Sequence, residues 1–108
     1  MTITHNGKDI PTADPKDPDS DVWYGFTYTL EDLETISSSV WLINGTLVSN
    51  GQTVDDLTFE ASDISDNVTK ANVSGGNVGV RYTLTNRIST NVTPSDDRSM
   101  YINVVKQL

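Results

Sequence analysis

The sequence predicts an all-β protein, an immunoglobulin-like antiparallel β-sandwich of about seven strands with an extended N-terminal arm. The chain has 108 residues, which is enough for one such sandwich and too short for a second core. Apolar and polar residues alternate with a period of two in several segments, and turn-forming residues separate these segments. No segment long enough to form a stable helix has the helical period.

The arm is expected to cover residues 1–21 and the sandwich residues 22–108. Three prolines, Pro11, Pro15 and Pro18, alternate in the arm with aspartates and leave little apolar surface to bury. We therefore expect the arm to serve in assembly, lying extended across a partner, and not to belong to the core of the domain.

The first strand is expected to begin at Val22, from which every second residue up to Tyr28 is apolar or aromatic. Gly25 lies within this strand and predicts a bulge or a close approach of neighbouring backbone. Residues 30–35 have a helical composition, but a segment this short does not form a helix alone. A turn between two strands is predicted there.

A second strand is expected over residues 36–42, with Ile36, Val40 and Leu42 on one face and Trp41 on the other. Trp41 is a candidate for the core tryptophan of an immunoglobulin-like sandwich. Tyr82, two residues before Leu84, resembles the tyrosine corner of the same fold. Both details favour a sandwich over a closed barrel.

Asn-Gly dipeptides at residues 44–45 and 50–51 predict tight turns on either side of a short strand at residues 46–49. The pattern is least regular over residues 52–66. It predicts one short strand followed by a loop at residues 63–66.

The last third of the chain has the clearest pattern. A strand over residues 68–73 ends in the turn formers of residues 74–77. Val78, Val80, Tyr82, Leu84 and Ile88 then share one parity and predict a long, half-buried strand. In the last strand the residues expected to face inward are Met100, Ile102 and Val104.

The residues give no arrangement suited to catalysis, so we expect a protein that is not an enzyme and has no cofactor. There is no cysteine, and the one histidine, His5, falls in the arm. The neighbouring carboxylates at residues 55–56 and 96–97 would point to opposite faces of a strand or into solvent. At residues 96–98 we expect a turn in which one aspartate caps backbone N–H groups and the other pairs with Arg98.

Alternate carboxylates at Asp17, Asp19 and Asp21 could converge on a hard cation such as calcium. The spacing departs from the EF-hand, because Val22 and Tyr28 stand where a glycine and a bidentate acid are needed. The competing interpretation, which we prefer, is that these acids are hydrated and turn or cap the chain.

The formal net charge is −8, and residues 1–34 hold eight of the fifteen acidic residues but only two of the seven basic ones. Nucleic acid is an unfavourable partner for such a chain, because binding to phosphate requires a basic surface. The first residues lack a cationic start followed by an apolar run, and no stretch approaches the length of a membrane span. We expect a soluble protein made in the cytosol.

Proteins are the expected partners, and the residues predicted to bind them belong to the arm and the start of the first strand. They are Pro11, Asp14, Pro15, Asp17, Pro18, Asp19 and Trp23. If Trp23 and Tyr101 shared one face, they would form a platform on which a sugar could stack.

Several short motifs resemble those of a family of small tailed-bacteriophage proteins. They are Asp17-Pro18-Asp19 followed by Asp21-Val22-Trp23-Tyr24, then Glu34-Thr35-Ile36-Ser37-Ser38-Ser39-Val40-Trp41, Ser74-Gly75-Gly76, Tyr82-Thr83-Leu84-Thr85-Asn86-Arg87-Ile88 and Asp96-Asp97-Arg98-Ser99. The family often has an Asp-Trp pair at the end of its first strand, where this chain has Thr27-Tyr28. Members are phage fibre–tail adaptor proteins, which are small immunoglobulin-like virion components.

The resemblance implies a structural part of a phage particle, made in the cytoplasm of the host bacterium and present in multiple copies. Its function would be to join the tail and the fibres through protein–protein docking, without binding nucleic acid or membrane. Two alternatives stay open. One is a capsid decoration or cement protein of the phage head, and the other is a carbohydrate- or cell-surface-binding β-sandwich module.

Overall fold

Eight β-strands make up the regular structure of the protein, a computed structural model that describes residues 10–92 and 94–106. The strands are β1 (Asp21–Thr27), β2 (Ile36–Ile43), β3 (Thr46–Val48), β4 (Gln52–Val54), β5 (Leu57–Ser65), β6 (Val68–Gly75), β7 (Arg81–Thr90) and β8 (Asp96–Asn103). The described residues contain no helix, so the predicted all-β class is confirmed. They accordingly include no helix able to span a membrane.

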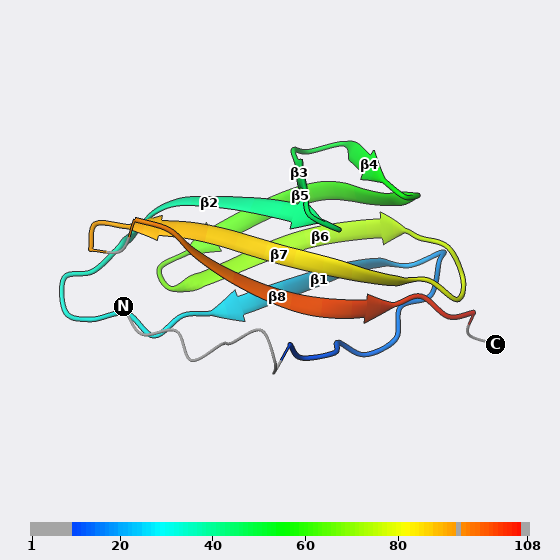
Figure 1. Ribbon diagram of the computed structural model, residues 1–108, viewed down its shortest axis with the longest axis horizontal. Coiled ribbons are helices and arrows are strands. Elements are labelled where there is room, and N and C mark those ends of the chain that lie inside the picture. The colour runs from blue at the N-terminus through cyan, green and yellow to red at the C-terminus, as the bar shows by residue number, and fades with distance from the viewer. Residues whose placement is uncertain (1–9, 93, 107–108) are drawn as a thin grey trace.

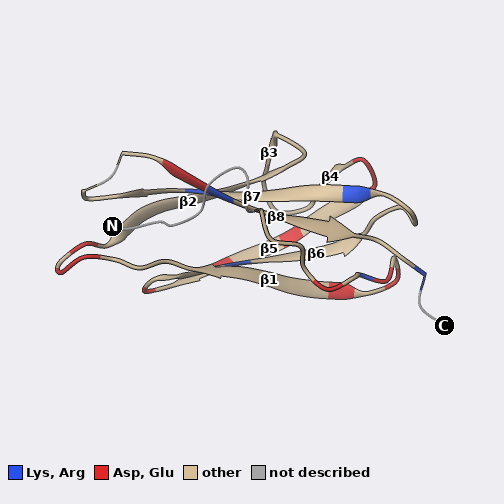
Figure 2. Ribbon diagram, turned by 60° about the horizontal axis from the view of Figure 1, so that its bottom comes forward, with Lys and Arg blue, Asp and Glu red and all other residues tan. Residues whose placement is uncertain are grey.

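The strands form two antiparallel sheets of four strands each, which pack face to face as a sandwich (Figure 1, Figure 2). One sheet has the order β1-β6-β5-β4 and the other the order β3-β2-β7-β8. The chain passes from one sheet to the other after β1, after β3 and after β6. The predicted sandwich is therefore confirmed, while its immunoglobulin-like character stays a prediction.

The core lies between the two sheets and is built from alternate residues of the long strands. Phe26 of β1 stacks on Trp41 of β2 with ring centroids 6.0 Å apart, and Trp41 lies 6.4 Å from the ring of Phe59 in β5. Most of the inward-facing positions predicted for the first strand and for the last two strands are buried: Tyr24, Phe26, Tyr28, Tyr82, Leu84, Ile88, Met100, Ile102 and Val104. Val22 and Val80 are only partly buried. The inward position predicted for Val78 is wrong, because β7 begins at Arg81 and Val78 is 56% exposed in the preceding turn.

The second strand shows where strict alternation holds and where it fails. Trp41 faces the core and is 2% exposed, whereas Val40 points outward and is 40% exposed. A bulge between Ile36 and Ser38 changes the register, so the start of the strand does not continue this alternation. Leu42, on the outer face, is also buried, because it pairs with Leu47 of β3.

Tyr82, which resembles a tyrosine corner in the sequence, hydrogen-bonds to backbone groups through its hydroxyl. Its hydroxyl accepts a hydrogen bond of 2.9 Å from the backbone N–H of Asn77, five residues upstream. The same hydroxyl donates to the carbonyl oxygen of Asp55 at 2.6 Å. The hydroxyl of Tyr82 thus links the start of β7 to the turn between β4 and β5.

The loop predicted at residues 63–66 is wrong, because β5 continues to Ser65. A bulge between Phe59 and Ala61 lets the ladder with β6 resume, and it places Asp63 opposite Lys70. An opposite-charge pair across two strands stabilises the ladder. Pairing with β6, the next strand along the chain, therefore overrides the polar, turn-like composition of this segment.

The pairing predicted between Arg98 and its own neighbours is also wrong. Residue 96 begins β8, and Asp97 instead pairs with Arg87 of β7 at 2.8 Å and 3.0 Å. Arg98 donates to the carbonyl oxygen of Thr27 at 2.7 Å and covers the ring of Tyr28, with its guanidinium carbon 5.6 Å from the ring centroid. The charges follow the cross-strand register and not the sequence spacing.

Candidate docking surface

Trp23 is the most prominent apolar side chain on the outer face of the first sheet. It belongs to β1, an edge strand, and alternation with the partly buried Val22 and the buried Tyr24 and Phe26 directs it outward. Its side chain is 53% exposed. A large aromatic residue left in water at a sheet edge is typical of a protein-binding surface.

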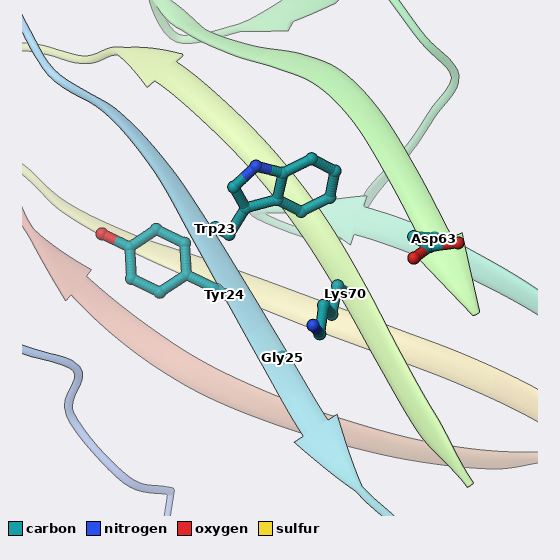
Figure 3. A pocket seen from close by; sticks show the side chains of 5 residues that line it. All are labelled: Trp23, Tyr24, Gly25, Asp63 and Lys70. Atoms are coloured by element: carbon teal, nitrogen blue, oxygen red, sulfur yellow. The ribbon is translucent and has the colours of Figure 1, made fainter. Parts of the chain in front are cut away.

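The surface beside Trp23 is hollowed, and the reason is Gly25, two residues further along the same face. A Cβ atom at residue 25 would lie 2.9 Å from the carbonyl oxygen of Thr69, so the neighbouring backbone leaves no room for a side chain. The predicted close approach at Gly25 is confirmed. A hollow of about 430 Å³ results, lined by Trp23, Tyr24, Gly25, Asp63 and Lys70 (Figure 3).

The described part of the arm, residues 10–20, runs along the last strand. Two backbone hydrogen bonds of 2.9 Å link Tyr101 of β8 to the arm: Ala13 N–H donates to its carbonyl oxygen, and its own N–H donates to Pro11. Lys16 continues the contact, donating to Asn103 and accepting from Val105, again at 2.9 Å. Residues 11–16 therefore lie in parallel beside the edge of β8, seen as the blue trace below β8 in Figure 1.

Lys16 anchors the arm from within, because its side chain is 1% exposed. The ammonium group donates to the carbonyl oxygen of Gly75, at the end of β6, at 2.7 Å and to that of Asp17 at 2.9 Å. Burial lowers the pKa of the Lys16 ammonium below its ordinary value, and the nearby carboxylate of Asp17 opposes that shift. The predicted boundary between arm and sandwich at residue 21 stays a prediction, but residues 11–16 are bonded to the sandwich.

A second hollow, of about 450 Å³, lies between the arm and β1. Four of the seven predicted partner-binding residues line it: Asp14, Pro15, Asp17 and Trp23. The other three lie elsewhere. Pro11 faces β8 through its carbonyl oxygen, and Pro18 and Asp19 form the turn that leads into β1.

The three aspartates at residues 17, 19 and 21 do not meet around a common point. The carboxylate of Asp17 accepts a hydrogen bond of 2.8 Å from the N–H of Asp19, as in a side-chain turn. Asp21 is the first residue of β1 and pairs with Ser74 of β6. Within residues 10–92 and 94–106, no group of three or more His, Cys, Asp or Glu side chains is placed to hold a metal ion.

The platform considered for Trp23 and Tyr101 is not formed, because the two residues belong to different sheets. Trp23 lies on β1, while Tyr101 lies on β8 of the other sheet, and the guanidinium of Arg81 stands over its ring at 4.7 Å. The arrangement that a stacked sugar would need is therefore missing from this part of the chain.

The paired carboxylates considered for catalysis have structural partners. Asp55 accepts from the side-chain amide of Asn44 at 3.0 Å, and Asp56 accepts from that of Asn77 at 2.8 Å. Both aspartates have positive φ in the turn between β4 and β5. His5 lies outside the described residues.

Sequence reasoning missed two members of the surface, Asp63 and Lys70. They come from β5 and β6, and only the register of that pair brings them beside Trp23. The positions at which alternation predicts outward side chains could have suggested them, but the sequence does not predict the bulge between Phe59 and Ala61.

Comparison with known proteins gives one family. The family model described as podophage GP4 fiber-tail adaptor protein gp77 matches residues 16–103, which is most of the chain, and confirms the resemblance seen in the sequence motifs. No curated protein and no solved structure matches the chain. The match includes the turn after Lys16 and both sheets. The chain therefore belongs to the podophage fiber-tail adaptor family, and it is a structural virion protein.

Proposed function

We propose that the protein joins the tail and the fibres of a phage particle by protein–protein docking, without a catalytic step. The observation that carries this proposal is the family match over residues 16–103. The fold supports it, because the outer strands β3 and β4 are short and leave strand edges at which neighbouring proteins can bind.

We infer that one docking surface is centred on Trp23. The indole is half exposed and has a hollow on each side, one above β6 and one toward the arm. A partner side chain that enters either hollow would bury the indole face, and aromatic anchors of this kind dominate interface energies. The outer surface of the arm carries Asp14 and Asp19, so the matching partner surface is basic (Figure 2).

Binding of the purified chain to the purified tail and fibre proteins of the same phage tests this proposal. We expect Trp23→Ala to weaken binding to one of the two by at least about tenfold, as for an aromatic hot spot, and to leave the melting temperature nearly unchanged. Val78→Ala is the matched control, because Val78 is also half exposed, at 56%, and lines neither hollow.

Equal binding by the Trp23→Ala chain and the unaltered chain would contradict the assignment of the surface. Localisation of the chain in an electron-microscopy map of the intact particle tests the role itself. Density on the head surface would favour the decoration protein, whereas density at the junction of tail and fibres is the expected result. Such a map would also give the copy number, which we expect to exceed one.

A further inference from the structure

The two long sides of the sandwich differ in how they are closed. On the side of β1 and β8, residues 11–16 lie along β8, and Arg98 covers the end of β1. On the side of β2 and β5, β3 pairs only with residues 41–43 and β4 only with residues 57–59. Residues 36–40 of β2 and 60–65 of β5 are therefore free edges within the described chain (Figure 1).

Three adjoining hollows of about 510, 320 and 480 Å³ follow these two edges. Neighbouring hollows share lining residues, so they form one groove, which we call the β2–β5 groove. The residues that line it along the two free edges include Ile36, Ser38, Ser39, Ser62, Asp63 and Ile64.

Ile64 shows that the groove opens into the space between the sheets. It pairs with Thr69, which is fully buried, so its side chain is on the inward face of β5. The side chain is nevertheless 46% exposed. An inward-facing isoleucine that remains half in water marks a part of the core that the described residues leave uncovered.

The free edge of β5 also carries unpaired backbone groups. The hydrogen bond from Tyr28 N–H to Asn67 sets the phase of the β1–β6 ladder, in which odd-numbered residues of β6 bond to β1. Even-numbered residues of β6 then form the hydrogen bonds to β5, so Lys70 bonds to Asp63. The backbone N–H and C=O groups of Ser62 and Ile64 point away from β6, toward the free edge. No hydrogen bond of these two residues' backbone to anything beyond β5 occurs within the described chain.

The opposite side of the same sandwich shows what closes such a groove. There an extended segment pairs its backbone with the edge of β8 and packs Ala13 against the core. The β2–β5 groove offers the same elements, a free strand edge and an uncovered apolar interior. An extended polypeptide that adds as a strand fits both requirements.

The charges that line the β2–β5 groove indicate which kind of polypeptide would bind there. The residues lining the groove include Glu34, Asp63 and Asp66 and no lysine or arginine, although Lys70 stands opposite Asp63 on β6. The arm of a second copy, with its aspartates, would meet like charge there. A segment that brings lysine or arginine is complementary.

We infer that the β2–β5 groove receives an extended segment of a partner protein, with alternating apolar side chains and at least one lysine or arginine, which adds as a strand to the free edge of β5. This inference rests on the proposed function and supplies its second surface: the Trp23 surface would hold one of tail and fibre, and the groove would hold the other.

The test uses the full chain with purified tail protein and purified fibre protein, each separately. We expect one of the two to protect the backbone amides of Ser62 and Ile64 from hydrogen exchange. Ser62→Pro removes an N–H that only an added strand would use, and should weaken that same complex by at least about tenfold. Ser62→Ala keeps the N–H and should bind within about twofold of the unaltered chain.

The exchange measurement needs no variant, so the test holds even if Ser62→Pro fails to fold. Unprotected Ser62 and Ile64 amides in a complex that does form would overturn the groove while leaving the proposed function intact. Protection that grows with the concentration of the chain alone would show that a second copy fills the groove, which also overturns the inference. If neither protein binds the unaltered chain, the proposed function fails and the groove with it.

Discussion

Two buried polar side chains lie in different regions of the sandwich and have different kinds of partner. In the centre, the amide of Asn86 donates to Ser39 at 2.9 Å and to the carbonyl of Val40 at 3.0 Å. Its oxygen accepts from the hydroxyls of Tyr28 at 2.8 Å and Thr69 at 2.7 Å. At the edge of the sandwich, the ammonium group of Lys16 donates to the backbone carbonyl oxygens of Asp17 and of Gly75, which ends β6.

The difference shows what each group does for the fold. Asn86 links side chains of both sheets, so it specifies how the two sheets lie on each other. Lys16 is bonded to backbone that is already in place, so it orders the arm and leaves the sheets independent of it. Removing Asn86 should therefore affect the whole domain, whereas changes at Lys16 should act mainly on the arm.

Asn86→Ala should have the largest effect. The substitution leaves the buried hydroxyls of Tyr28 and Thr69 without their acceptor, and we expect a loss of about 3 kcal/mol in the free energy of unfolding. Urea denaturation of the two chains measures it. Asn103→Ala is the control, because Asn103 lies on the outer face of β8, accepts from Arg81 at the surface and should cost about 0.5 kcal/mol. Equal losses would mean that the central network does not link the sheets.

Shortening the arm should have an intermediate effect. A chain that begins at Asp17 lacks the backbone hydrogen bonds to β8 and the Lys16 anchor that a chain beginning at Ile10 retains. We expect the shorter chain to be less stable by about 2 kcal/mol but still folded. Thermal unfolding of both chains compares them. If their midpoints agree, the arm contributes to assembly alone, as the sequence suggested.

Lys16→Met should have the smallest effect, and the effect should depend on pH. In the unfolded chain the ammonium keeps its proton up to its ordinary pKa of 10.5, whereas burial makes the folded chain lose it at lower pH. In that interval the unfolded state binds more protons, so the stability of the unaltered chain rises with pH. We expect the difference in unfolding free energy between the two chains to move in favour of the unaltered chain as the pH rises toward 10.5.

Urea denaturation of both chains at several pH values tests this shift. The comparison with Lys16→Met is required because Tyr24 and Tyr28 act in the opposite direction. Burial raises the pKa of both phenols, so stability that depends on them is lost as the unfolded chain ionises at high pH. A difference between the two chains that stays constant with pH would contradict the role assigned to the Lys16 ammonium.

Part of the candidate docking surface could be predicted from the sequence. Trp23 lies outward because its neighbours in β1 are apolar at every second position, and Asp14, Pro15 and Asp17 share its hollow because they precede it closely in the chain. The contribution of Asp63 and Lys70 could not be predicted, because it depends on the pairing of β5 with β6.

The sequence by itself determined the class of the fold, the direction of the side chains in β1, β7 and β8, and the family. Each of these depends on local periodicity or on short motifs, and neither depends on which strand a given strand pairs with. The tertiary structure decided which polar side chains are buried and which strand edges stay open. It also decided that Arg98 contacts the end of β1, whereas Asp97 pairs with Arg87. These depend on strand order and on bulges, and both are set by contacts between residues far apart in the chain.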